Sequence, residues 1–142
     1  MKHQLELERS DLDVRRVSDE YLAAWRDRDA ARIIALHTPD TSFQLHVGTP
    51  AANGRQAVQA TFAGLFRQWP GFGFITHRLL LGPHHWILDW TMTATVPRQV
   101  DGRTVDKEIR LHCLDVVELS PEGLVARKDT FVDAAQLRAA MA

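Results

Sequence analysis

The sequence lacks the features that mark the simplest functional classes. Its single cysteine rules out a disulfide within the chain and predicts a reducing compartment, the cytoplasm. Seventeen basic and eighteen acidic residues leave a net charge of -1 and form no basic stripe, so we expect no nucleic-acid partner. No hydrophobic run approaches membrane-spanning length, and the charged N-terminus has no apolar signal region, so we expect no membrane association.

Recognisable catalytic motifs are also missing. The sequence has no glycine-rich phosphate loop and no Gly-x-Ser-x-Gly nucleophile turn, and Cys113 has no thiol-nucleophile signature around it. His84 and His85 are adjacent, so in a strand they point to opposite faces, and no histidine pair has the spacing of a helical zinc site. We therefore expect neither a metal nor a cofactor.

The pattern of apolar residues predicts an α+β fold in one domain, residues 1–142, with residues 1–10 as an N-terminal arm. Apolar positions recur with helical spacing first, and the period then changes from 3.6 to 2. We expect a first helix from Val14 to Trp25, capped by Ser10 or Asp11. The other expected helices are Ala30 to His37, a third between Gly54 and Pro70, and Ala134 to Met141; the expected strands are Thr41 to Val47, Phe72 to Leu81, His84 to Val96, Val105 to Leu119 and Leu124 to Val132.

Asp115 is the most informative residue, because it occupies the apolar phase of its strand. Alternate side chains point to opposite faces of a sheet, so Asp115 shares a face with Leu111, Cys113 and Val117. A buried carboxylate is costly unless it is paired, hydrogen-bonded or protonated. Asp115 is therefore either a satisfied structural group or a functional one.

The hairpin after this strand predicts what faces Asp115. Pro121, Glu122 and Gly123 suit a three-residue turn with a left-handed glycine, which places Asp115 opposite Asp129. Two facing carboxylates would share a proton, which suits general acid/base catalysis. A four-residue loop would instead place Asp115 opposite Lys128 as a structural ion pair. If Asp115 does face Asp129, the nearby cation Arg127 could oppose the rise in the pKa of that carboxyl pair.

Four stretches of the chain carry a resemblance to the nuclear transport factor 2-like superfamily, in its SnoaL-like and ketosteroid-isomerase-like branches. They are Tyr21 to Leu36 (YLAAWRDRDAARIIAL), Asn53 to Arg55 (NGR), Cys113 to Leu119 (CLDVVEL) and Lys128 to Asp133 (KDTFVD). The resemblance implies a cone, in which a strongly bent antiparallel or mixed sheet wraps round a long N-terminal helix and leaves an apolar pocket at the open end. It also implies a homodimer, for which the polar sheet face with Thr91, Thr93, Thr95, Arg110 and His112 is a candidate surface.

The resemblance implies catalytic roles for four residues. Tyr21 and Asp115 fall where ketosteroid isomerases place their two oxyanion donors, but Leu45 occupies the position of the general base. Asp129 falls where limonene-epoxide-hydrolase-like members place a catalytic aspartate. His77 resembles the strand histidine of scytalone-dehydratase-like members.

Each of these matches is incomplete. The Arg and Asp that complete the epoxide-hydrolase triad correspond to Trp90 and Met92. The carboxylate that should accompany His77 is matched only approximately, by Asp27.

We therefore expect a cofactor-independent isomerase or lyase, of dehydratase or cyclase type, acting on a small hydrophobic carbonyl compound. Asp115, Tyr21, His77 and Asp129 are its candidate catalytic residues. Two alternatives remain open: a non-catalytic carrier or sensor of hydrophobic ligands, and a dimerisation module without a ligand. The residues expected to line the pocket are Trp25, Phe43, Leu45, Phe62, Phe66, Trp90, Met92, Leu111, Cys113 and Phe131.

Overall fold

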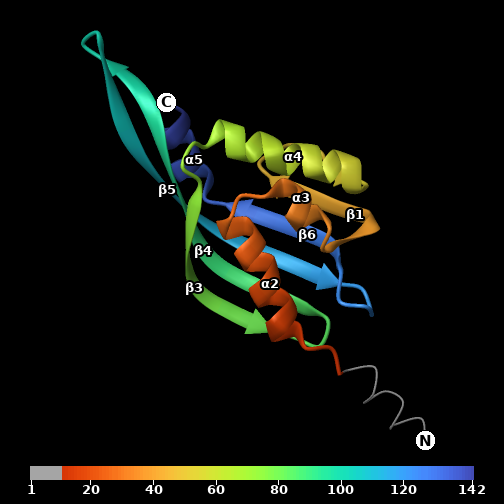
Figure 1. The fold of residues 1–142 in the computed structure, drawn as a ribbon. Helices are drawn as coiled ribbons and strands as arrows, with labels where there is room; N and C mark the ends of the chain where they lie inside the picture. Colours follow the sequence, from red (N-terminus) through yellow and green to blue (C-terminus); the bar gives the residue numbers. More distant parts are fainter. Residues whose placement is uncertain (1–10) are drawn as a thin grey trace, which may run out of the picture.

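Helices and a curved sheet follow one another along the chain in the order that the change of period predicts. A computed structural model describes residues 11–142. The expected N-terminal arm lies outside this range. Figure 1 shows α2, α3 and α4 on one side of the sheet, while β4 and β5 continue into a hairpin that projects beyond the body. The elements are α2 (Val14–Arg26), α3 (Ala30–Ile34), β1 (His37–His46), β2 (Ala52–Asn53), α4 (Arg55–Gln68), β3 (Gly73–Leu81), β4 (His85–Val100), β5 (Arg103–Leu119), β6 (Val125–Val132) and α5 (Ala134–Met141).

The first helix begins at Val14, as expected, but its cap is Asp13. The Asp13 carboxylate accepts a hydrogen bond from the backbone N–H of Arg16 at 3.1 Å, which satisfies one of the free donors of the first turn. Of the two predicted caps, Ser10 lies outside the described residues and Asp11 is not the cap. No helix in residues 11–142 has both the length and the apolar character needed to cross a bilayer.

The second helix is shorter than its pattern suggests. It ends at Ile34, and His37 instead begins β1, where it pairs with Val125 of β6. Long-range strand pairing has overridden the local helical pattern at this point. The shift carries the His37 side chain into the core, where it is fully buried.

The six strands within residues 11–142 form one mixed sheet in the order β2-β1-β6-β5-β4-β3. β1 pairs with β6 in parallel, and all the other neighbouring pairs are antiparallel. The inner face of the sheet packs against α2 and α4, and the core lies between them, with Trp86, Leu88 and Val117 almost fully buried. This arrangement confirms the predicted α+β cone.

The hairpin between β5 and β6 has the expected turn but not the expected register. Leu124 accepts from the backbone N–H of Ser120 at 2.8 Å, and Gly123 takes φ 85°, as the three-residue turn requires. The ladder then shifts, since Leu119 pairs with Val125 but Glu118 pairs with Arg127. Ala126 is the extra residue of a β-bulge, a feature that bends and twists the strand that contains it.

The bulge corrects the pairing predicted for Asp115. Asp115 lies opposite Thr130, and Cys113 lies opposite Val132. Asp129 pairs with Val116 and its side chain belongs to the outer face, so the predicted Asp115–Asp129 dyad is wrong. The four-residue-loop alternative is also wrong in register, because Lys128 lies opposite Val117.

Candidate functional site

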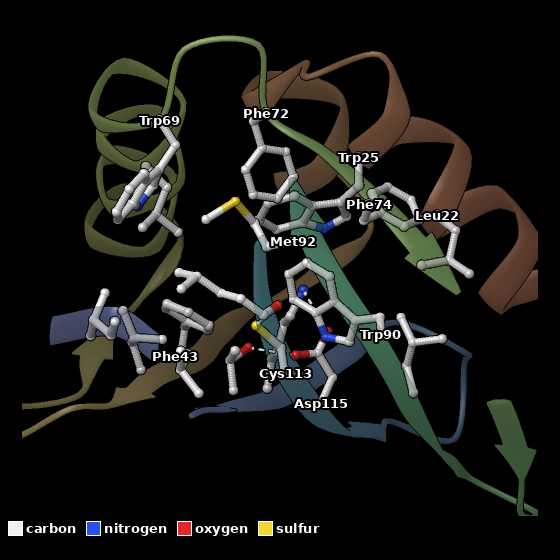
Figure 2. A pocket seen from close by; sticks show the side chains of 18 residues that line it. Leu22, Trp25, Phe43, Trp69, Phe72, Phe74, Trp90, Met92, Cys113 and Asp115 are labelled. Atoms are coloured by element: carbon white, nitrogen blue, oxygen red, sulfur yellow. Dashed lines mark hydrogen bonds and ion pairs between the residues drawn. The ribbon is translucent and has the colours of Figure 1, made fainter. Parts of the chain in front are cut away.

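One pocket opens between the helices and the inner face of the sheet (Figure 2), with about 730 Å³ of empty space including the part open to solvent. Helices α2 and α4 supply one wall, strands β1, β3, β4, β5 and β6 the other, and α5 contributes Leu137. Among the described residues that line it, Asp115 and Lys128 carry charged groups and Thr130 carries a hydroxyl. The remaining lining residues are Leu22, Trp25, Phe43, Leu45, Leu65, Trp69, Phe72, Phe74, Leu88, Trp90, Met92, Leu111, Cys113, Val132 and Leu137.

Most of the residues expected in the pocket do line it. They are Trp25, Phe43, Leu45, Trp90, Met92, Leu111 and Cys113. Phe62 and Phe66 stand behind the wall, with ring centroids 4.8 Å and 5.4 Å from that of Trp25. The expectation for Phe131 is wrong, because the bulge turns its ring to the outer face, where it stacks on His46 at 4.1 Å.

Asp115 projects from β5 into this pocket and is 3% exposed. Its Oδ1 accepts a hydrogen bond from the Thr130 hydroxyl at 2.7 Å. Its Oδ2 lies 3.6 Å from the Nζ atom of Lys128. A carboxylate has about four lone-pair positions, so two partners leave acceptor capacity for a ligand.

Lys128 is the cation that compensates for the burial of the Asp115 carboxyl group. Lys128 is 5% exposed, and its Nζ atom lies 4.1 Å from the centre of the Trp25 ring, a cation–π contact. Burial alone would lower the pKa of Lys128, but attraction by Tyr21 and Asp115 outweighs that effect and the pKa lies above its usual value. Lys128 is therefore a cation at neutral pH, and it lies beside Asp115 in place of the second carboxylate that we expected.

Tyr21 stands behind this pair and does not line the pocket. Its hydroxyl lies 3.4 Å from Lys128 Nζ and 3.0 Å from His37 Nε2, while Nδ1 of His37 lies 2.8 Å from the Thr41 hydroxyl. An ammonium group only donates, so the Tyr21 oxygen accepts from Lys128 and its O–H donates to His37 Nε2. Nδ1 then carries the proton of a neutral His37 and donates to Thr41.

The protonation states of this chain follow from its burial. Burial, followed by the charges of Lys128 and Arg55, lowers the pKa of His37 to about 3. Burial also raises the pKa of Tyr21, even though Lys128 acts in the opposite direction. Both rings are therefore neutral at pH 7: Tyr21 accepts a hydrogen bond from Lys128, and His37 accepts one from Tyr21.

Cys113 is an apolar wall residue and not a nucleophile. Burial, followed by the charge of Asp115, raises the pKa of its thiol to about 12. The reactive thiolate is therefore scarce at neutral pH.

His77 lies on the outer face of the sheet, outside the pocket. It occupies an irregularity of β3 between Thr76 and Arg78, and its Nε2 lies 2.7 Å from the Thr91 hydroxyl. His77, a candidate catalytic residue, is therefore not among the residues that line the pocket. Asp27, its approximate partner, instead forms an exposed ion pair with Arg32.

Asp129 has its own partners on the same outer face. Arg127 donates to both of its oxygens, at 2.9 Å and 3.3 Å, and His46 Nε2 lies 2.8 Å from Oδ1. Burial alone would raise the pKa of the Asp129 carboxyl, but these hydrogen bonds outweigh it and the pKa lies below its usual value. Asp129 is therefore an ionised group away from the pocket.

The polar residues missed as site candidates are Lys128, Thr130 and His37. Lys128 and Thr130 alternate with Val132, so period 2 places them on one face, and only the bulge shows that this face is the inner one. No cluster of three or more His, Cys, Asp or Glu side chains that could hold a metal ion occurs in residues 11–142.

The fold and the pocket define a class of small α+β proteins with an apolar pocket that contains a few polar side chains. A family model described as SnoaL-like domain matches residues 19–128, and the chain belongs to this family. A search of characterised proteins by sequence gave no significant match.

Solved structures agree on the fold. SalBIII, described as an epoxide hydrolase/cyclase-like enzyme in salinomycin pyran ring formation, is 17% identical, with 87% of this chain and 92% of that chain covered and a TM-score of 0.71. A protein described as a SnoaL-like polyketide cyclase from Shewanella denitrificans is 12% identical, with 90% and 96% covered and a TM-score of 0.74. A ketosteroid isomerase-like protein from Erwinia carotovora is 18% identical, with 84% and 92% covered and a TM-score of 0.59. At these sequence identities the similarity establishes the fold only, and the chemistry has to be argued from the residues of the site.

Proposed function

We propose that the protein is a cofactor-independent isomerase or lyase, of dehydratase or cyclase type, that moves a proton on a small hydrophobic carbonyl compound. The observation that carries the proposal is the ion pair of Asp115 and Lys128 in the wall of an otherwise apolar pocket. Titratable groups held in a hydrophobic pocket beside a charged partner are candidates for acid/base roles. The described enzymes among the structural neighbours, which include cyclases, are compatible with this class of reaction.

In the proposed reaction Asp115 takes a proton from the carbon next to the substrate carbonyl. The electron pair of that C–H bond forms a C=C bond, and negative charge moves to the oxygen. The Lys128 ammonium, 3.6 Å from the carboxylate, stabilises this charge electrostatically. Return of the proton to another carbon completes an isomerisation. In a cyclisation the enolate carbon attacks a second carbonyl, whose π electrons move to its oxygen, and this alkoxide takes up the proton held by Asp115.

The roles of the other residues follow from their positions. Thr130 orients the Asp115 carboxylate through its 2.7 Å hydrogen bond, and Tyr21 positions Lys128 from behind. The proposal assigns no role to His77 or Asp129, because neither lines the pocket. We also propose a reducing compartment such as the cytoplasm, where the free, buried Cys113 would stay reduced.

Proton exchange of a model ketone tests the proposal. 2-Tetralone in D₂O exchanges the protons next to its carbonyl, and NMR measures the rate with and without protein. Loss of a general base costs about 10²–10⁴-fold, so Asp115→Asn should lose most of the acceleration. Quenching of the tryptophans in the pocket wall shows in parallel that the ketone binds.

A hydrophobic-ligand carrier is the second candidate, because Asp115 and Lys128 satisfy each other without a ligand. Bound 2-tetralone whose exchange matches that in buffer would contradict the enzyme proposal and support the carrier. Equal acceleration by wild type and Asp115→Asn would remove Asp115 from the mechanism.

A further inference from the structure

The indole N–H of Trp90 is a buried donor without an acceptor. Trp90 belongs to β4, is 8% exposed and lines the pocket. Its Nε1 is shielded from solvent and has no hydrogen-bond partner in the described part of the chain. Such a group has given up its bond to water without a replacement, which is unfavourable unless a ligand supplies the acceptor.

Only one other pocket residue has such an atom. Nε1 of Trp25 also has no partner within hydrogen-bond geometry, but it is close enough to the Tyr21 hydroxyl to help lower the pKa of that group. The Trp25 donor therefore faces the polar chain behind the wall. The indole N–H of Trp90 therefore remains available as a hydrogen-bond donor to a ligand in the pocket.

The strand register brings Trp90 close to the carboxylate. Trp90 pairs with Cys113, and the next inward-facing pair along the same two strands is Leu88 with Asp115. Trp90 and Asp115 are thus diagonal neighbours on one face, a separation that an aromatic side chain can bridge. Figure 2 shows the nitrogen side of the Trp90 ring turned toward Asp115.

The rings around Trp90 fix its orientation. Phe74 meets it edge-on with ring centroids 6.1 Å apart, and Phe72 lies 6.3 Å away. Aromatic neighbours supply no strong acceptor for an N–H group, and they favour a flat apolar molecule alongside. The pocket therefore offers a ring-shaped ligand apolar walls, one neutral donor from Trp90 and the charge of Lys128.

We propose that Trp90 donates its indole N–H to an oxygen of the ligand, and that the ligand is a flat, largely apolar ketone, enol or phenol. This inference rests on the proposed function and deepens it. The Trp90 N–H holds the carbonyl oxygen, so that the adjacent carbon faces the diagonal carboxylate of Asp115. Lys128 favours ligands whose oxygen carries or develops negative charge.

Two ligands with the same rings distinguish the contribution of the oxygen contact to affinity from that of burying the rings. 2-Naphthol and naphthalene share the same rings, and only naphthol offers an oxygen. We expect Trp90→Phe to weaken binding of 2-naphthol about tenfold, because one hydrogen bond to a buried donor is lost. Binding of naphthalene should change less than about twofold, since phenylalanine keeps an apolar ring in the wall.

Trp69→Phe is the matched control. Trp69 also lines the pocket, and its Nε1 is not among the buried atoms that lack a partner. This variant should leave the ratio of the two affinities unchanged. Equilibrium dialysis measures both ligands with every variant.

An NMR measurement on the wild type covers the case in which Trp90→Phe fails to fold. With ¹⁵N-labelled tryptophan, the Trp90 indole proton should move downfield with 2-naphthol and not with naphthalene. An affinity ratio unaffected by Trp90→Phe, or an indole resonance that does not respond to naphthol, overturns the inference. These outcomes are independent of proton exchange by Asp115, so failure here and failure of the proposed function are distinguishable.

Discussion

Lys128 and Asp115 form a buried ion pair across neighbouring strands, with 3.6 Å between Nζ and Oδ2. They are not directly opposite, since Val117 faces Lys128 and Thr130 faces Asp115. The pair is diagonal, so each group keeps a second partner, Thr130 for the carboxylate and Tyr21 for the ammonium.

The two charges should be strongly coupled in stability. Lys128→Met leaves the Asp115 carboxylate buried without a cation and should lower the free energy of unfolding by about 3–5 kcal/mol. Asp115→Leu combined with Lys128→Met should cost much less than the sum of the single changes, because no uncompensated charge remains. Urea unfolding of the four proteins measures the coupling.

An exposed ion pair provides the control for this cycle. Arg78 and Asp89 lie 3.1 Å apart on the outer face, and the Arg78 side chain is 67% exposed. Breaking that pair with Arg78→Ala should cost less than about 1 kcal/mol. Additive single changes at Asp115 and Lys128 would show that the two charges do not interact.

His37 should make the protein lose stability in mild acid. Its pKa is about 3 in the folded protein and near 6.5 when exposed, so between these values the unfolded chain binds one proton more. The contribution of His37 is complete above pH 6.5, and stability falls as the pH falls, by about 1.4 kcal/mol per unit within this window.

Comparison with His37→Gln isolates the effect of this one ring. Glutamine can still accept a hydrogen bond from Tyr21 but does not titrate. Urea unfolding between pH 6.5 and pH 4.5, above the range in which most carboxylates titrate, should show a shallower loss for the variant. Parallel curves for the two proteins would mean that His37 takes up a proton in the folded state.

The two candidate bases on the outer face should be dispensable for proton exchange. Asp129→Asn and His77→Gln should each leave the 2-tetralone rate within about twofold, unlike Asp115→Asn, since neither side chain lines the pocket. Asp129→Asn should still destabilise the fold by about 1–3 kcal/mol, because it weakens the bonds from Arg127 and His46. A large loss of exchange in a stably folded Asp129→Asn protein would contradict this assignment.

The outer face of the sheet should mediate self-association. Cross-strand pairing places apolar side chains side by side there, and we call them the outer apolar band: Leu80, Ile87, Leu114, Val116 and Phe131. Two ion pairs flank this band, Arg78 with Asp89 and Arg127 with Asp129, so it is bordered by charges of both signs. Apolar side chains flanked by both signs of charge can pair with a second copy across a two-fold axis.

Light scattering during size-exclusion chromatography tests this proposal. We expect a homodimer for the wild type and a monomer for Ile87→Glu, because a charge at the centre of the outer apolar band would have to be desolvated. Val100→Glu, at the exposed end of the β4–β5 hairpin, should remain dimeric. A wild type that is monomeric at all concentrations would refute the dimer.

Local patterns in the sequence were sufficient for the order of the main helices and strands and for the faces of β5. Alternation along β5 placed Asp115 on the inner face with Leu111 and Cys113, and all three line the pocket. The turn residues Pro121 to Gly123 specified the hairpin that forms. These inferences succeed because strand alternation and turn chemistry depend on adjacent residues only.

The register of β6 and the position of His37 depended on contacts far apart in the chain. Ala126 has no property that marks it as a bulge, yet it turns Asp129 outward and brings Lys128 to Asp115. β6 must bend to pair with β5 on one side and with β1 on the other, and a bulge provides that bend. The sequence by itself determined that a carboxylate faces the interior, and only the packing of the curved sheet decided that its partner is an ammonium group.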